Sequence, residues 1–271
     1  MSKLKILDVH PSGPSRSCQF LQKLSEEQKW DLEFQLVSSY SDIEGQDANM
    51  VLIPLELSAK VFPDLTIVPT QVRLLRCFDS LFQENGKLYP RVIIAQALHD
   101  VLVERAKDLD TRTPAFVIGE GEFARIATVV LAEMGITEVY LVGRQPAVSQ
   151  HALDLKKSFF GIQFNILPLE ELTMQSVSAG IIINTVDLNE QKDLLTDLSY
   201  FNFMKGDGYV MDLNLNIENH QLLEEAERAD LRVLPPAQVY SALTLRWLKR
   251  LRVNHNLSVE ELEQRWKGFL T

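Results

Sequence analysis

The feature that most constrains the fold is a regular alternation of apolar runs and amphipathic segments between residues 114 and 236. Short apolar runs that are typical of buried strands recur there, among them "PAFVIG" (114–119) and "EVYLVG" (138–143). Segments with apolar residues at helical spacing separate these runs, as "EFARIATVVLAEMG" (122–135) does. Strands that alternate with helices form a parallel sheet covered by helices. The sequence therefore predicts an α/β protein with a doubly wound parallel sheet.

The turn between the first of these strands and its helix carries a glycine pattern. Gly119, Gly121 and Ala124 fit G-x-G-x-x-A directly after a strand and before a helix. Gly119 would permit the tight turn, Gly121 would let the backbone approach a pyrophosphate, and Ala124 would let the helix pack on the sheet. Amides at the helix N-terminus attract such an anion. The pattern predicts a Rossmann-like NAD(P)-binding-type domain, and a purely structural glycine turn is the alternative.

Acidic residues in the same turn argue against tight binding. Glu120 and Glu122 carry negative charge near the expected position of the pyrophosphate, where like charges repel. Glu120 is free to point to solvent, whereas Glu122 lies in the first helical turn, where the dipole favours an acid, and is placed to fill the anion site itself. We therefore expect weak or absent dinucleotide binding. If one binds, Arg144 after the second strand favours NADP, because a basic residue there tolerates a 2′-phosphate; a solvated charge is the alternative.

The chain also shows signs of a domain division. An "NGK" tripeptide predicts a β-hairpin in its first part, and a helix expected at 92–110 ends at the break "TRTP". These patterns predict a first α/β domain at 1–111, the parallel-sheet domain at 112–236, and C-terminal helices at 237–271 that pack back on the first domain.

Composition restricts the classes of partner. The formal net charge of −10 argues against nucleic acid and anionic membranes. No stretch approaches the ~18 apolar residues of a membrane span, and the N-terminus lacks the apolar run of a signal peptide. Cys18 and Cys77 have neither metal-binding nor redox spacing. We therefore expect a cytoplasmic protein that takes a small-molecule ligand and holds no metal; the oligomeric state stays open.

Several segments resemble the shikimate dehydrogenase family in their order and spacing, over nearly the whole chain. These segments are "HPSGPSRSC", "VLIPLE", "ENGKLY", "EVYLVGRQP", "INTVDLN" and "MDLNLNIENHQLLEEAERADLRV". The resemblance implies a substrate-binding-type domain followed by the NAD(P)-binding-type domain. It also implies that Asn184 lies near the nicotinamide, and it places Asp212, Leu222 and Leu223 in register with the family's pattern.

The resemblance further implies a lysine and an aspartate that handle the proton during hydride transfer, and this chain departs at both positions. The lysine position falls on Glu56 and the aspartate position on Ile94. Ile94 can neither take nor give a proton, and Glu56 would repel an anionic substrate. Asp79 stands where the family has an asparagine, so Glu56 and Asp79 are the candidate catalytic residues. Leu52 and Met50 replace further polar residues of the family.

The serines near the N-terminus are retained. Ser15 and Ser17 flank Arg16 at the start of a predicted helix, and hydroxyls, amides and a guanidinium together suit a substrate carboxylate. Simple capping of the helix by Ser17 is the alternative. The family's late glutamine has no clear equivalent, because Gln238 lies out of register.

Three functions follow from these observations. The first is a shikimate dehydrogenase-like protein that has lost that activity, a pseudoenzyme that binds a small ligand. The second is an NAD(P)-dependent oxidoreductase for another small hydroxy acid or carbonyl substrate, in which Glu56, Asp79 or Tyr89 handles the proton. The third is a structural or interaction protein whose nucleotide site is closed by Glu122. The loss of both proton-handling residues, together with acid in the glycine turn, favours the first.

Overall fold

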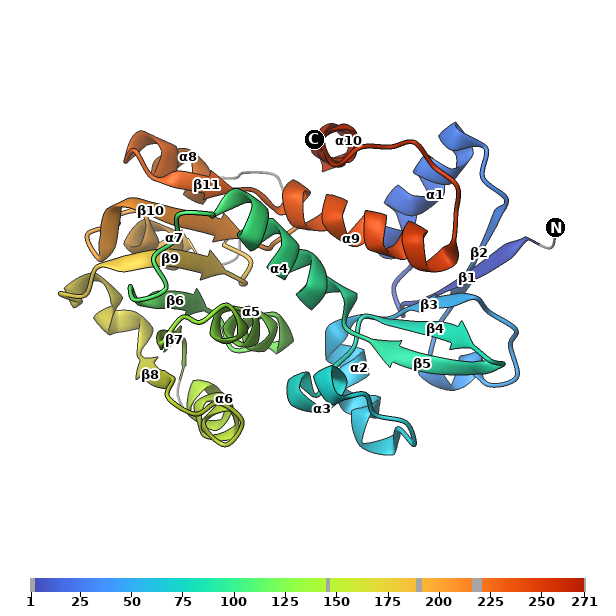
Figure 1. Cartoon of the computed structure of the whole chain (residues 1–271), viewed down its shortest axis with the longest axis horizontal. Coiled ribbons are helices and arrows are strands. Elements are labelled where there is room, and N and C mark those ends of the chain that lie inside the picture. The colour runs from blue at the N-terminus through green and yellow to red at the C-terminus, as the bar shows by residue number, and fades with distance from the viewer. Residues whose placement is uncertain (1–2, 145–146, 189–191, 216–220, 271) are drawn as a thin grey trace. The chain divides into compact units, whose positions relative to one another are not determined.

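The computed structural model describes residues 3–144, 147–188, 192–215 and 221–270. The chain forms two compact units, each with its own sheet (Figure 1). Unit 1 comprises the chain up to Ala97 together with Tyr240–Phe269, and unit 2 runs from Leu98 to Val239. The first division falls inside a continuous helix, α4 (Ile93–Arg105). The α/β class predicted from the sequence is confirmed.

The sheet of unit 1 combines parallel strands with a hairpin, in the order β2-β1-β3-β4-β5. Its strands are β1 (Leu4–Val9), β2 (Leu32–Val37), β3 (Met50–Leu52), β4 (Ser80–Glu84) and β5 (Lys87–Arg91). The first three are parallel, and β4 and β5 run antiparallel to each other. The predicted hairpin is confirmed, because Asn85 and Gly86 take φ values of 52° and 76°, the left-handed conformation that a tight hairpin turn requires.

The helices of unit 1 come from both ends of the chain. They are α1 (Arg16–Gln28), α2 (Leu55–Val61), α3 (Thr70–Leu75), most of α9 (Pro236–Leu251) and α10 (Val259–Leu270), with the short 3-10 turns η1 (Tyr40–Ile43) and η2 (Phe62–Asp64). A capping box starts α10: the amide of Ser258 donates to Glu261 (3.0 Å), and the amide of Glu261 donates to the Ser258 hydroxyl (3.1 Å). Trp266 of α10 stacks on Phe20 of α1, with ring centroids 3.8 Å apart.

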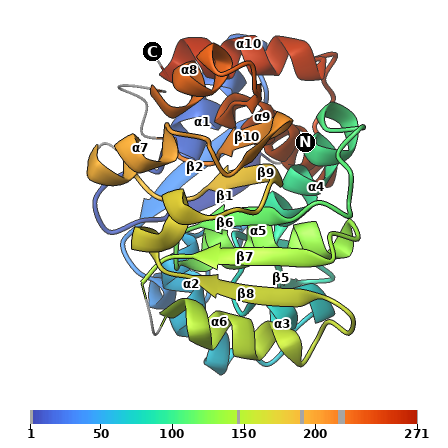
Figure 2. The ribbon, with the colours of Figure 1, turned by 90° about the vertical axis from the view of Figure 1, so that its left-hand side faces the viewer.

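The sheet of unit 2 is parallel throughout and has the order β11-β10-β9-β6-β7-β8. Figure 2 shows β9, β6, β7 and β8 of this sheet one below the other. The strands are β6 (Ala115–Ile118), β7 (Glu138–Val142), β8 (Gln163–Leu167), β9 (Ala179–Asn184), β10 (Met204–Asp212) and β11 (Arg232–Leu234). The chain runs outward from β6 to β8 and then returns to β9 on the other side of β6. The predicted doubly wound topology is confirmed, and ligands of such sheets bind at this switch point.

Helices cover the sheet of unit 2 through apolar contacts. They are α5 (Glu122–Glu133), α6 (Ala147–Lys156), α7 (Lys192–Leu198) and α8 (Gln221–Arg228), with the 3-10 turn η3 (Leu169–Met174). Phe116 and Ile118 of β6 pack in one cluster with residues of α7 and α8. Every residue of β6 and β9 is buried, which explains why their sequences are continuous apolar runs. No helix in the described part of the chain is long and apolar enough to cross a membrane.

Candidate functional site

The glycine turn lies at the carboxyl end of β6, where it begins α5. Gly119 has a φ of 127°, and a Cβ added to it would lie 2.2 Å from the Thr185 hydroxyl oxygen. That hydroxyl donates to the carbonyl of Ile118 (2.6 Å), so it cannot easily move away. Only glycine therefore suits this position.

Gly121 is different, because the space beside it is open. It precedes α5 in an extended conformation, and no side chain caps the helix from this position. A Cβ added to Gly121 would meet no atom within 4 Å. A cavity of about 390 Å³ adjoins the turn, lined by both glycines, the end of β7, Val186 and Leu194. Backbone amides at a helix start beside open space suit a phosphate group, so the residues present fit the pyrophosphate of a dinucleotide.

Glu120 does not point freely to solvent as the sequence suggested. Its carboxylate reaches across to the end of the neighbouring strand β7 and binds Arg144, with Nε to Oε1 and Nη2 to Oε2 both at 3.0 Å. The backbone amide of Arg144 also donates to Glu120 Oε1. Partial burial raises the pKa of Glu120, but these hydrogen bonds outweigh it and leave the pKa below its ordinary value. Register explains the pairing, since Ile118 and Val142 lie side by side and each charged residue follows two positions later.

Glu122 is not placed in the anion site by this structure. It is half-buried in the first turn of α5, and its carboxylate accepts no hydrogen bond from any of the described residues. Ala124 is buried against the sheet, as expected for the third position of the glycine pattern. Of the two acids in this turn, Glu120 is therefore the one whose carboxylate makes hydrogen bonds among the described residues, and it makes them to Arg144.

Asn184 ends β9 next to the turn and is fully buried. Its side-chain amide donates to the carbonyl of Val186 (2.9 Å) and to Asp212 Oδ1 (3.2 Å). The amide of Asn214 also donates to that Asp212 oxygen (2.9 Å). Burial raises the pKa of Asp212 to about 6, against the opposing effect of these two donors. Asn184 thus shapes the backbone after β9, and its contact with a nicotinamide remains a prediction.

The serine segment of unit 1 is organised by a buried acid that the sequence analysis missed. The carboxylate of Asp8, at 1% exposure, accepts from the amide of Ser15 (2.6 Å) and from its hydroxyl (2.9 Å). Ser15 caps α1 by accepting from the amide of Cys18 (3.2 Å), so the alternative interpretation, in which Ser17 caps this helix, is wrong. The hydroxyl of Ser17 has no hydrogen bond to a described residue, and Arg16 is exposed. Burial raises the pKa of Asp8 despite the Ser15 bonds.

The two positions at which the resemblance places the family's proton-handling pair differ sharply in exposure. Glu56 is exposed in the first turn of α2. The side chain of Ile94 is only 3% exposed and belongs to the core. Asp79 lies beside Ile94: its Oδ2 accepts from the Ile94 amide (2.6 Å) and its Oδ1 accepts from the Ser80 hydroxyl (2.6 Å). Burial raises the pKa of Asp79 to about 6, although these bonds lower it. Asp79 therefore caps the start of α4.

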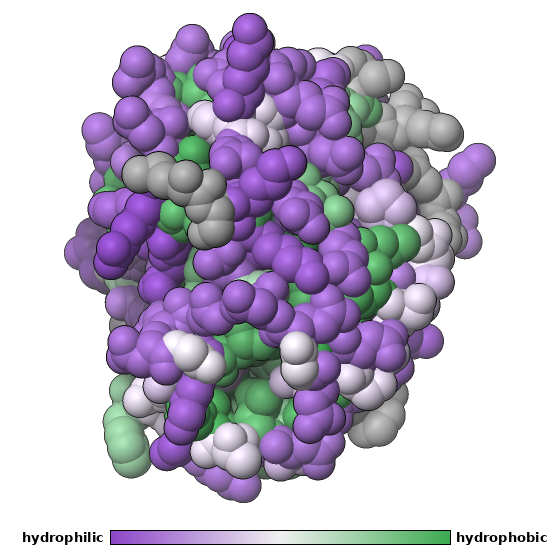
Figure 3. Space-filling view, turned by 90° about the vertical axis from the view of Figure 1, so that its right-hand side faces the viewer, coloured by the Kyte–Doolittle hydropathy of each residue, from purple (hydrophilic) through white to green (hydrophobic). Residues whose placement is uncertain are grey.

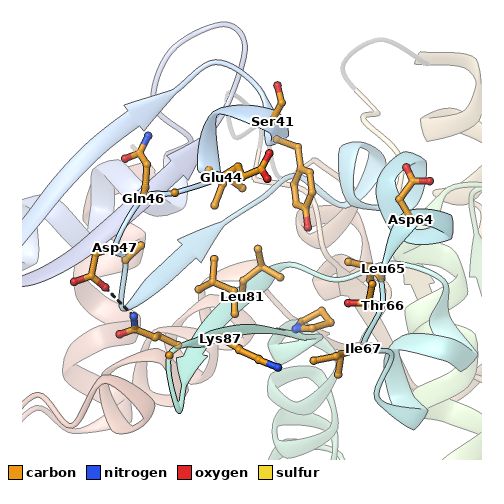
Figure 4. Close-up of a pocket in the computed structure, with 18 residues that line it drawn as sticks. Ser41, Glu44, Gln46, Asp47, Asp64, Leu65, Thr66, Ile67, Leu81 and Lys87 are labelled. Atoms are coloured by element: carbon orange, nitrogen blue, oxygen red, sulfur yellow. Dashed lines mark hydrogen bonds between the residues drawn. The ribbon is translucent and has the colours of Figure 1, made fainter.

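Two further features could not be read from the sequence. The side-chain oxygen of Gln238 is buried without a hydrogen-bond partner among the described residues, which leaves a spare acceptor at the start of α9. A cavity of about 830 Å³ lies in unit 1 between η1, η2 and the β4–β5 hairpin, and none of the predicted site residues lines it. Figure 4 shows Leu81 in its wall, with Glu44 above and Lys87 below. Figure 3 shows the side of the molecule that is at the right in Figure 1. In the lower half of this view, hydrophobic residues are exposed and hydrophilic residues surround them.

Ligands for a metal do not gather in the described part of the chain. No group of three or more histidine, cysteine, aspartate or glutamate side chains is placed there to hold an ion. Cys18 and Cys77 are both buried and unlinked.

Comparison with known proteins gives one consistent likeness. No protein-family model matches the chain. It is 24% identical over 156 residues to the shikimate dehydrogenase (NADP(+)) of Rhizobium meliloti (strain 1021). That match covers 58% of this chain and 53% of the relative, so it spans about half of the relative's length.

Solved structures match over almost the full length. Shikimate 5-dehydrogenase from Listeria monocytogenes, in complex with shikimate and NAD, has a TM-score of 0.80 at 12% identity and covers 97% of this chain and 96% of its own. The Thermus thermophilus enzyme, in complex with NADP(H) and shikimate, has a TM-score of 0.73 at 19% identity, covering 99% and 100%. The 5-ketofructose reductase of Gluconobacter sp. strain CHM43 has a TM-score of 0.77 at 13% identity, covering 99% of both chains. The resemblance inferred from the sequence is thereby confirmed: part of the chain is similar in sequence to a shikimate dehydrogenase, and the chain has the fold of the shikimate 5-dehydrogenases.

Proposed function

We propose that this protein binds a nicotinamide dinucleotide at the glycine turn of unit 2 and does not oxidise shikimate. Binding is supported by the open space at Gly121, the uncapped start of α5 and the adjoining cavity. The dinucleotide, when bound, supplies the hydride chemistry. The residues of this chain hold its phosphates and adenosine end.

The proposed lack of shikimate dehydrogenase activity rests on one observation, the burial of Ile94. The resemblance puts a proton-handling aspartate at this position, and the side chain found there is apolar and 3% exposed. Proton transfer needs a titratable group within hydrogen-bond reach of the reacting hydroxyl. Glu56, at the lysine position, is exposed but carries the opposite charge to lysine. The proposed role is that of a ligand-binding pseudoenzyme.

Two measurements on the purified protein test this proposal. Isothermal calorimetry with NAD and NADP should detect binding of at least one dinucleotide. Incubation with shikimate and either oxidised cofactor should give no reduced nicotinamide, while an active shikimate dehydrogenase in the same buffer does. Protein-dependent formation of reduced cofactor from shikimate contradicts the proposed loss of activity. Failure of both dinucleotides to bind supports instead an interaction protein with a closed nucleotide site.

A second candidate function is favoured by Asp79. This residue is half-buried, and its carboxylate has a pKa near 6, a value that suits a general acid or base close to neutral pH. The protein would then be an oxidoreductase for another small hydroxy acid or carbonyl compound. A panel of such compounds, assayed with both cofactors, tests this function: turnover by the wild-type chain that is lost in Asp79→Asn would establish it.

A further inference from the structure

The carboxylate of Glu120 occupies a built position at the end of β7. Both of its oxygens engage the Arg144 guanidinium at 3.0 Å, and one also accepts from the Arg144 backbone amide. Gly143 makes room for it, because a Cβ at that position would lie 2.9 Å from Glu120 Cγ. The Glu120 side chain is 21% exposed, whereas that of Arg144 is 82% exposed. The carboxylate is thus seated against the protein, and the guanidinium lies over its outer side.

The end of β7 is the place where doubly wound folds distinguish between dinucleotides. A carboxylate there accepts from the 2′-hydroxyl of the adenosine ribose, whereas an arginine accommodates a 2′-phosphate. In this chain the residue that follows β7 and Gly143 is an arginine, but a carboxylate reaches the same place from the glycine turn after β6. The tertiary structure therefore supplies the group that the second strand itself lacks.

We infer that Glu120 makes the nucleotide site selective for a dinucleotide with a free 2′-hydroxyl, NAD, over one with a 2′-phosphate, NADP. This inference rests on the proposed dinucleotide site. A 2′-phosphate would bring its negative charge against the Glu120 carboxylate. It would also have to replace two charge-assisted hydrogen bonds that Arg144 already makes. A free ribose hydroxyl can instead donate to an unused lone pair of the same carboxylate.

The selectivity runs opposite to the expectation from Arg144 alone. An arginine after the second strand favours NADP only if its guanidinium is available to the phosphate. Here the guanidinium is bound to Glu120 in a two-point contact. Removal of the Glu120 carboxylate should release it.

Calorimetric titration of four proteins with NAD and NADP tests the inference. The proteins are the wild type, Glu120→Ala, the double variant Glu120→Ala/Arg144→Ala, and Glu122→Gln as a matched control. The control removes an acid from the same turn that has no hydrogen bond to a described residue. We expect the wild type and Glu122→Gln to bind NAD about ten-fold or more tightly than NADP. Glu120→Ala should reverse the preference, and the double variant should lose the gain in NADP affinity.

The outcomes separate this inference from the proposed function. NADP binding by the wild type that equals or exceeds NAD binding, and that does not change in Glu120→Ala, overturns the selectivity while the dinucleotide site stands. Absence of binding by either dinucleotide in all four proteins overturns both. The same titrations with adenosine 5′-monophosphate and with adenosine 2′-monophosphate should reproduce the preference. Such a result would show that the preference arises at the adenosine end of the dinucleotide.

Discussion

At the residue scale, the two glycines of the turn carry separable roles. Gly119 needs its positive φ and its lack of a Cβ, because the Thr185 hydroxyl lies where a Cβ would go. Gly121 has neither constraint, since its φ is ordinary and the space beside it is open. The chain therefore offers a matched pair of Gly→Ala changes, one affecting the fold and the other affecting binding.

We expect Gly119→Ala to lower the free energy of unfolding by about 2–4 kcal/mol, through backbone strain and the clash with Thr185. Gly121→Ala should lower it by less than about 1 kcal/mol, yet weaken NAD binding, because the added methyl group fills the space proposed for the pyrophosphate. Urea unfolding and calorimetry measure the two effects. Equal stability losses in both variants would contradict this separation.

Asp212 gives a pH-dependent prediction at the same scale. Burial raises its pKa to about 6 in the folded protein, so the folded state holds a proton that the unfolded chain releases between about pH 4 and pH 6. Stability from this group is therefore present at low pH and lost as the pH rises through that window. Asp212→Asn keeps an acceptor for the Asn184 and Asn214 donors and removes the buried charge. It should raise the free energy of unfolding on the order of 2 kcal/mol near pH 8 and have little effect near pH 4.

Urea unfolding at the two pH values measures the Asp212 effect. Asp31→Asn is the control, because Asp31 is exposed and its side chain takes no hydrogen bond from a described residue. The control should change stability by little at either pH. A loss of stability in Asp212→Asn that is the same at both pH values would show that the ionised carboxylate is not the source of the cost.

At the element scale, helix starts are specified by acids and hydroxyls placed before them. The capping box of α10 is local in sequence, because Ser258 and Glu261 are three residues apart. The acceptor for α4 is not local: Asp79 accepts from the amide of Ile94, 15 positions later, across the β4–β5 hairpin. No local sequence pattern indicates that Asp79 is the acceptor for the start of α4.

We expect Asp79→Ala to lower the free energy of unfolding by about 1–2 kcal/mol, because the amide at the start of α4 loses its acceptor. Asp79→Asn should cost less, since the amide oxygen can still accept from Ile94. Thermal or urea unfolding of both variants near pH 4 compares them, because the raised pKa of Asp79 keeps the wild-type carboxyl neutral at that pH. Equal losses in the two would argue against capping as the role of this side chain.

At the scale of the whole molecule, the chain has the fold of the shikimate dehydrogenases, and the resemblance aligns apolar residues with several polar positions of that family. These residues, Ile94, Leu52 and Met50, are all buried and belong to the core of unit 1. Polar residues introduced at these positions would therefore lower the stability of the fold, whatever their effect on catalysis.

The variant Glu56→Lys/Ile94→Asp should remain unable to oxidise shikimate. Ile94→Asp would bury a carboxylate without a partner and should lower the free energy of unfolding by about 2–4 kcal/mol. Glu56→Lys alone should change stability by less than about 0.5 kcal/mol, because the position is exposed. Assays of reduced cofactor and urea unfolding test both statements. Recovery of shikimate oxidation in the double variant would contradict this expectation and show that residues 56 and 94 alone account for the proposed lack of activity.

The sequence by itself determined the α/β class, the doubly wound sheet, the hairpin at Asn85–Gly86 and the glycine turn. Each depends on periodicity or on turn chemistry between residues close in the chain, and such local preferences can be read directly. The alignment of Glu56 and Ile94 with the family's proton-handling pair came from the resemblance. A resemblance of this kind indicates which residue stands at a position, but not whether its side chain is exposed. Burial of Ile94 became known only from the packing around it.

Tertiary structure alone decided which acid of the glycine turn pairs with Arg144 and which serine caps α1. Glu120 and Arg144 are 24 residues apart and meet because β6 and β7 are neighbours in register. Ser15 is held by Asp8, which the end of β1 brings beside the start of α1. Pairings of this kind depend on strand order and on the direction of side chains at strand ends. Strand order and side-chain direction cannot be read from a periodic pattern in the sequence. The packing of the whole sheet determines which distant segments bring their side chains into contact.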